Sequence, residues 1–124
     1  MKAISLKQPW ASLVAIGKKT IETRTWSTNY RGDLLIVSSK TMDKNFPLKN
    51  FSEVFFEIPF GETLAIVNLV DCRPMRKEDE DLACCKIYAG AYAWIFSKVI
   101  KIDPFTIRGN LGLWNTDYKL PQEV

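Results

Sequence analysis

Histidine is absent from the 124-residue sequence, and its absence excludes several common kinds of catalytic and metal site. A Ser-His-Asp triad, a Cys-His pair and a histidine-ligated zinc all require an imidazole. Acid–base chemistry would have to use lysine, glutamate, aspartate, tyrosine or cysteine. Cysteine is scarce as well, with three occurrences at Cys72, Cys84 and Cys85. Their odd number and the adjacent pair favour reduced thiols over disulfides. Because three scattered cysteines without histidine do not suit a structural zinc site, we expect neither a metal nor another cofactor.

Long hydrophobic runs are also missing. No apolar stretch approaches the roughly 18 residues that a membrane-spanning helix needs. The N-terminal residues are interrupted by Ser5 and Lys7 and do not look like a secretion signal. We therefore expect a cytoplasmic protein that does not associate with membranes. A length of 124 residues with 47% hydrophobic and 25% charged side chains predicts one globular domain over residues 1–124, and we favour a monomer.

Acidic side chains are scarce in the first third of the chain. Residues 1–40 contain seven lysines and arginines against two acids, whereas residues 41–84 contain five against nine. The basic first third suits a polyanionic partner such as RNA. A solvated surface with no partner accounts for the same excess equally well.

Residues 8–24 organise the chain and predict a short helix, a turn and a charged strand. The helix, from about residue 9 to 16, places three apolar side chains on one face, namely Trp10, Leu13 and Val14. Gly17 is suited to end it in a left-handed conformation. In the strand that follows, Ile21 points to one face while Glu22 and Arg24 lie together on the other.

Five further segments are predicted as extended: residues 2–7, 33–39, 63–72, 90–102 and 111–114. A β-bulge is expected near Ser97-Lys98. Short helices are predicted at residues 77–86 and near 48–55. About five or six strands with two or three short helices indicate an α+β, mainly β, fold, and favour a small closed or half-closed β-barrel.

The residues of the charged strand carry a resemblance to a known family. The pattern Gly17-x-Lys19-x-x-Glu22-x-Arg24 resembles the signature of the ASCH domain family at all four positions. Residues 5–11 (Ser-Leu-Lys-Gln-Pro-Trp-Ala), 30–36 and 109–114 are similar to its small stand-alone members, so the resemblance covers nearly the whole chain. It implies a PUA-like β-barrel of a kind that commonly binds RNA, with a cleft where the signature residues emerge.

The residue types near the signature suit a binding cleft for RNA or a nucleoside. Lys19 and Arg24 offer positive charge to a phosphate, and Glu22 accepts from a base amino group or orients its basic neighbours. The candidate binding residues are Lys19, Glu22, Arg24, Trp26, Tyr30, Ser38 and Lys40, of which the two aromatic residues of the polar turn are the stacking candidates. Trp10 and Trp94 are predicted to belong to the core. A purely structural Glu22–Arg24 ion pair is the alternative.

The leading interpretation is a non-catalytic module that binds RNA or a nucleoside, such as one with a modified base. Some small ASCH proteins that resemble this chain are amidohydrolases that deacetylate N4-acetylcytidine, with a lysine, a threonine three residues later and a distant glutamate. Lys19 matches that lysine, but Glu22 occupies the threonine position. Other ASCH proteins are ribonucleases, a chemistry for which Lys19, Glu22 and Arg24 would serve. A protein-interaction adaptor, using the phenylalanine-rich residues 46–60, is the third interpretation.

Overall fold

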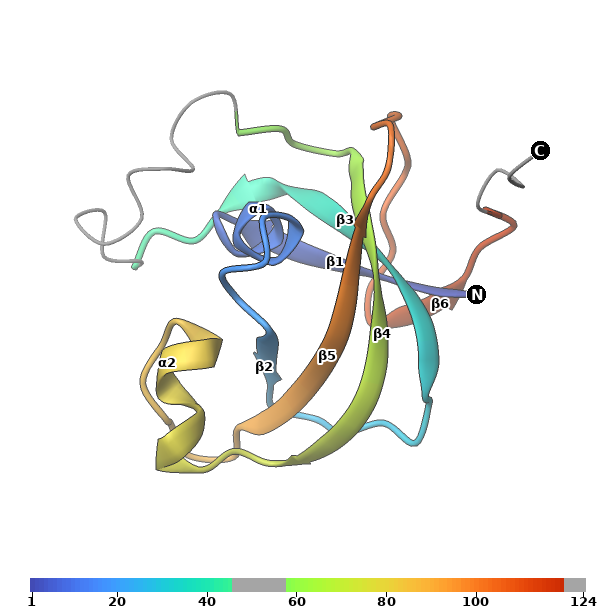
Figure 1. Cartoon of the computed structure of the whole chain (residues 1–124). Helices are drawn as coiled ribbons and strands as arrows, with labels where there is room; N and C mark the ends of the chain where they lie inside the picture. Colours follow the sequence, from blue (N-terminus) through green and yellow to red (C-terminus); the bar gives the residue numbers. More distant parts are fainter. Residues whose placement is uncertain (46–57, 120–124) are drawn as a thin grey trace.

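A strongly curved six-stranded sheet forms the centre of the molecule (Figure 1). The computed structural model describes residues 1–45 and 58–119. Neighbouring strands follow the order β2-β5-β4-β3-β1-β6, and all pairs are antiparallel except β1 with β3. The strands are β1 Lys2–Gln8, β2 Ile21–Arg24, β3 Gly32–Met42, β4 Thr63–Pro74, β5 Tyr92–Lys101 and β6 Leu113–Asn115. Every predicted strand is therefore found, with ends that differ by at most three residues.

Apolar side chains cover both faces of the sheet. Successive side chains of a strand point to opposite faces, so Leu34 and Ile36 of β3 enter one core while Leu35 and Val37 enter another. The first core includes Trp94 of β5 and side chains of helix α1 (Trp10–Ala15). Residues that follow β5 cover the second core. Burial on both faces explains why β3 and β4 are continuous apolar runs in the sequence.

The helices lie where the sequence predicts them. After α1, Gly17 adopts a left-handed conformation with φ of +82°, as expected for a residue that ends a helix. A 3₁₀ turn, η3 (Lys77–Asp79), leads directly into α2 (Glu80–Ala83). The helix predicted near residues 48–55 lies outside the described residues.

The bulge predicted in β5 is also confirmed. Val67 of β4 is opposite Val99, and the next residue, Asn68, is opposite Ser97. Lys98 is therefore the extra residue, and its φ of +51° is typical of the local kink that a bulge introduces.

The small closed or half-closed β-barrel expected from the sequence is not confirmed, because the sheet that the described part of the chain forms is not closed. Strands β2 and β6 are the two edges of the sheet, and no pairing joins them within the described residues. Each edge strand is short, with four residues in β2 and three in β6, which limits how much backbone it can pair. The fold is thus a mainly β, open but curved sheet with few helices. Among the described residues, no helix is long and apolar enough to cross a membrane.

Candidate functional site

The three charged signature residues form one ion network at the edge of the sheet. The carboxylate of Glu22 lies between two cations, with Oε1 3.6 Å from Nζ of Lys19 and Oε2 3.1 Å from Nε of Arg24. Exposure of the side chain rises along the network, from 2% for Lys19 through 9% for Glu22 to 25% for Arg24. The network therefore has a buried end and an open end.

Lys19 is the buried end of this network. Its ammonium group donates a hydrogen bond to the carbonyl oxygen of Ala83, at the end of α2. It also lies 5.0 Å from the centroid of the Trp10 ring, within the range of a cation–π contact. These contacts hold Lys19 in place, so that it acts on the open part of the site through Glu22.

Arg24 connects two distant strands of the sheet. Its Nη2 donates to the carbonyl oxygen of Ser5 at 2.6 Å, while its Nε donates to Glu22. Ser5 belongs to β1, which is fifth in the strand order, whereas Arg24 belongs to β2, which is first. A side chain thus joins β2 to β1, two strands that do not pair with each other in the described residues.

A hollow of about 350 Å³ lies in front of Glu22 and Arg24, and we call it the signature pocket. Trp10 forms part of its wall, and Lys7 adds a further positive charge. Asn110 and Leu111 reach it from the segment between β5 and β6. The pocket therefore combines an anion, cations, an amide and an aromatic ring.

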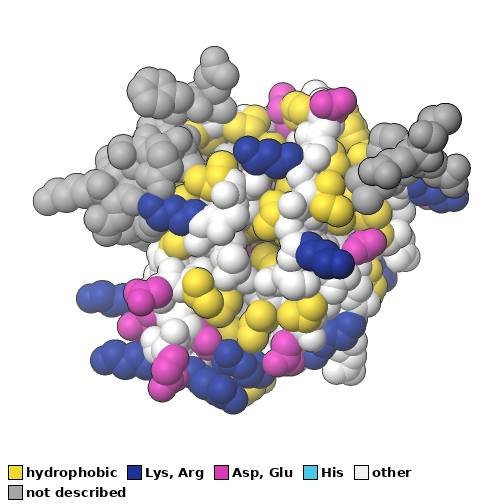
Figure 2. Space-filling view, viewed as in Figure 1, with side chains coloured by type: hydrophobic (Ala, Val, Ile, Leu, Met, Phe, Trp, Pro, Cys, Tyr) yellow, Lys and Arg dark blue, Asp and Glu magenta, His cyan; other side chains and the backbone are white. Residues whose placement is uncertain are grey.

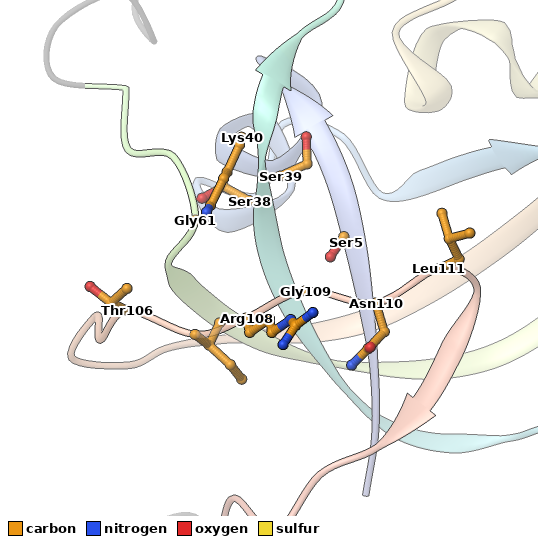
Figure 3. Close-up of a pocket in the computed structure, with 11 residues that line it drawn as sticks. Ser5, Ser38, Ser39, Lys40, Gly61, Thr106, Arg108, Gly109, Asn110 and Leu111 are labelled. Atoms are coloured by element: carbon orange, nitrogen blue, oxygen red, sulfur yellow. The ribbon is translucent and has the colours of Figure 1, made fainter.

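A second hollow of about 750 Å³ adjoins the signature pocket. Figure 3 shows that Ser38, Ser39 and Lys40 reach it from the end of β3, and that Arg108 reaches it from the chain segment that crosses over β1. We call this segment, residues 105–112, the strap, and the larger space the strap hollow. Its wall combines hydroxyl and charged side chains with Ile107 and Leu111, so it offers both polar and apolar contacts.

The charge of the visible surface is mixed. Figure 2 shows acidic and basic side chains interspersed, most densely around α2, and no continuous basic stripe. Among the described residues, no group of three or more histidines, cysteines, aspartates and glutamates is arranged to hold a metal ion. Recognition at this site therefore depends on the local groups of the two hollows.

The ASCH domain model matches residues 4–106, which include the whole charged network. The chain belongs to the ASCH domain family. Activating signal cointegrator 1 of mouse and of human are both 29% identical to it over 135 aligned residues. The alignments cover 96% of this chain but only 23% of the length of those relatives.

Solved structures place the fold in the same family. The ASCH protein of Zymomonas mobilis superposes with a TM-score of 0.66 at 14% identity, covering 94% of this chain and 87% of that chain. Its S128A mutant gives a TM-score of 0.62 at 13% identity, covering 94% and 88% of the respective chains. At such low identity the likeness concerns the ASCH fold alone.

The structure brings together only some of the binding residues predicted for this ASCH domain. Trp26 packs edge-on against Trp94, with ring centroids 4.8 Å apart and planes at 83°, and accepts a hydrogen bond from it through the backbone. Tyr30 donates its hydroxyl to the carbonyl of Asp33. Neither side chain belongs to the described walls of the two hollows. A polar turn in the sequence does not reveal that its aromatic residues pack back onto the core.

Trp10 is the aromatic residue that lines the signature pocket, although its apolar spacing predicts the core. It is partly buried, and its indole N–H donates to Asp43 at 2.8 Å. The backbone N–H of Asn45 chiefly lowers the pKa of Asp43, and the indole and Lys7 lower it further against the opposing effect of burial. Asp43 thus remains an anion that fixes the ring. Trp10 is the first residue of α1 and stands nine positions before Lys19, and this nearness to the signature is the signal that the sequence offers.

The two β3 residues predicted to line the cleft differ in availability. Ser38 is fully buried, and its hydroxyl bonds the backbone of Glu62 as both donor and acceptor. Lys40 is exposed and lines the strap hollow. Arg108 and Asn110 also line that hollow, and sequence reasoning missed both because they lie in a turn without regular periodicity.

Proposed function

We propose that this ASCH domain is a binding module for RNA, and that it takes one base into the signature pocket. The family is associated with RNA, and the basic first third of the sequence suits a polyanion. The observation that carries the proposal is the placement of Glu22 between Lys19 and Arg24, facing a hollow that Trp10 lines.

The chemistry of this arrangement suits the edge and face of a base. A carboxylate has about four acceptor positions, and the network occupies only part of them. Glu22 therefore retains the capacity to accept from a ring N–H or an exocyclic amino group. Stacking of a base on an aromatic ring contributes about 1–3 kcal/mol, and Trp10 is the ring available in the pocket. A nucleoside with a modified base would use the same contacts.

The position of Lys19 supports binding over hydrolysis. An amidohydrolase or ribonuclease that uses this lysine needs its amino group at the substrate. Here the residue is 1% exposed, and its ammonium donates to the carbonyl of Ala83. Lys19 is absent from the walls of both hollows in the described part of the chain. The adaptor interpretation rests on residues 46–60, most of which lie outside the described residues.

A combined binding and turnover assay tests the proposal. Fluorescence anisotropy of a labelled RNA pool at low salt gives the affinity, while mass spectrometry follows acetylated cytidine and RNA length in the same tube. We expect Arg24→Ala to weaken binding at least about tenfold, because it removes a charged contact near the phosphate and releases Glu22.

Arg31→Ala is the matched control. Arg31 forms an exposed 3.6 Å ion pair with Asp71, and it lines neither hollow among the described residues. Equal affinities for the wild type and the Arg24→Ala variant would contradict the proposal. Turnover that disappears in Lys19→Ala would instead identify a hydrolase.

A further inference from the structure

The two hollows form one continuous groove. Four residues line both of them, namely Ser5, Ser39, Asn110 and Leu111. Figure 3 shows the strap crossing β1 at this junction, with Ser5 on the strand and Asn110 on the strap. A ligand that extends out of the signature pocket therefore enters the strap hollow.

Cations in the strap hollow lie on two opposite sides. Lys40 extends from the end of β3 and Arg108 from the strap, as Figure 3 shows. Both are exposed, and neither forms an ion pair with another residue in the ranges 1–45 and 58–119. This distinguishes them from Arg24, whose charge is shared with Glu22. Two exposed cations that line one hollow together with hydroxyl side chains suit a phosphate group.

An exposed apolar side chain stands at the junction of the hollows. Leu111 is 99% exposed and lines both spaces. Nearby, Ser5 Oγ is a buried polar atom for which the described residues supply no hydrogen-bond partner. Buried polar atoms normally have partners, so this hydroxyl is an exception at the junction of the hollows. The exposed Leu111 is the side chain there that a ligand can contact.

Building on the proposed function, we infer that the groove holds two consecutive nucleotides of a single RNA strand. The base of one nucleotide occupies the signature pocket beside Trp10, with Leu111 in contact with its ring. The adjoining phosphate lies between Lys40 and Arg108 in the strap hollow. A base-paired nucleotide does not fit this arrangement, because its pairing edge has to be free to meet Glu22.

A ladder of ligands tests this inference by isothermal titration calorimetry with the full chain. The ladder consists of a nucleoside, its 5′- and 3′-monophosphates, a dinucleotide and a single-stranded hexamer, with inorganic phosphate and a duplex as separate probes. We expect the dinucleotide to bind about tenfold more tightly than the nucleoside. The double variant Lys40→Ala/Arg108→Ala should abolish this gain and leave nucleoside affinity unchanged. It should also lower the salt slope of hexamer binding by about 0.7 for each lost phosphate contact.

Lys86→Ala is the charge-matched control, because Lys86 is exposed in the loop after α2 and lines neither hollow. Equal affinities along the ladder, or an unaffected double variant, would overturn the two-nucleotide groove but leave base binding intact. Inorganic phosphate that competes as well as the dinucleotide would show an anion site alone and overturn it too. Tight binding of the duplex would also overturn the two-nucleotide groove. Failure of the proposed function is distinct, since no nucleoside or RNA would then bind at all.

Discussion

Two buried carboxylates, Glu22 and Asp79, illustrate how the same kind of ion network serves different purposes. Both side chains are less than 10% exposed, and both are held by arginine. Arg73 donates hydrogen bonds of 2.7 and 2.8 Å to the two carboxylate oxygens of Asp79, and the backbone N–H of Arg76 donates a third. Asp79 lines neither the signature pocket nor the strap hollow. Its interactions are directed entirely at the corner between β4 and α2.

Glu22 differs because its partners leave part of it available. Its contact with Lys19 is long, at 3.6 Å, and Arg24 approaches through a single nitrogen. The signature pocket opens directly in front of it. A carboxylate whose partners fill most of its acceptor positions stabilises the fold, whereas one held in place with more spare capacity is suited to a ligand. The following predictions test this distinction.

Removal of Lys19 should have the largest effect on folding. Lys19→Met leaves the Ala83 carbonyl without its donor and Glu22 with an incomplete partner set in a buried place. We expect the free energy of unfolding to fall by about 3 kcal/mol, as for other buried pairs that lose one member. Urea denaturation measures it, with Lys86→Met as the exposed control. A loss below about 1 kcal/mol would show that the network does not hold this corner.

Asp79→Asn should lower stability but not RNA binding. The amide keeps the size of the side chain but loses the charge that Arg73 pairs with, at a cost of about 2 kcal/mol. RNA affinity should stay within about twofold of the wild type, because the corner is separate from both hollows. Denaturation and anisotropy on the same preparation measure the two effects. A parallel loss of affinity would remove the distinction between the carboxylates.

The contribution of Asp79 should depend on pH in the acid range. The hydrogen bonds from Arg73, aided by the Arg76 backbone and its charge, lower the pKa of Asp79 from 3.8 to about 2 despite burial. The folded state therefore favours the ionised form, and this stabilisation is complete above about pH 4. It is lost as pH falls from about 4 to about 2. Denaturation midpoints across this window should converge for the wild type and Asp79→Asn, and a constant difference would contradict the assignment.

Glu22→Gln should reverse the pattern seen at Asp79. The substitution preserves shape but replaces an acceptor oxygen with a donor amide in the signature pocket. We expect RNA affinity to fall about tenfold, or about 1.4 kcal/mol, with a smaller change in unfolding free energy. Calorimetric titration and urea denaturation separate these two quantities. If the free energy of unfolding falls and RNA affinity does not, Glu22 has a structural role. This is the alternative given by the sequence, a purely structural Glu22–Arg24 ion pair.

Gly109→Ala should produce the smallest change, confined to the side of the molecule that carries Glu22. A Cβ at this position would lie 2.7 Å from Ser5 Oγ, so the strap or the hydroxyl has to move. A side chain pushed roughly 30° away from its rotamer costs about 0.5–1.5 kcal/mol, and we expect an effect at the lower end of that range. The double variant with Ser5→Ala should recover both stability and affinity. Failure to recover would mean that the strap position depends on other contacts.

Much of the fold follows from local patterns. The apolar runs of β3 and β4, the helix stop at Gly17 and the bulge at Lys98 all lie where spacing and turn chemistry predict them. Strand alternation likewise places Glu22 and Arg24 of β2 on one face, where they form an ion pair. The side-chain contact between β2 and β1 was not predictable in this way. It depends on Arg24 reaching Ser5 across four strand positions, which no local pattern contains.

The sequence by itself determined the elements, the ASCH membership and the charge pattern of the signature. Tertiary structure alone decided which polar groups are buried, which form ion pairs and which face a hollow. It brings Lys19 into contact with the end of α2, Trp26 into contact with Trp94, and Gly109 of the strap close to Ser5 of β1. The physical reason is that helix and strand periods specify the face on which a side chain lies, whereas its partners come from segments distant in the chain.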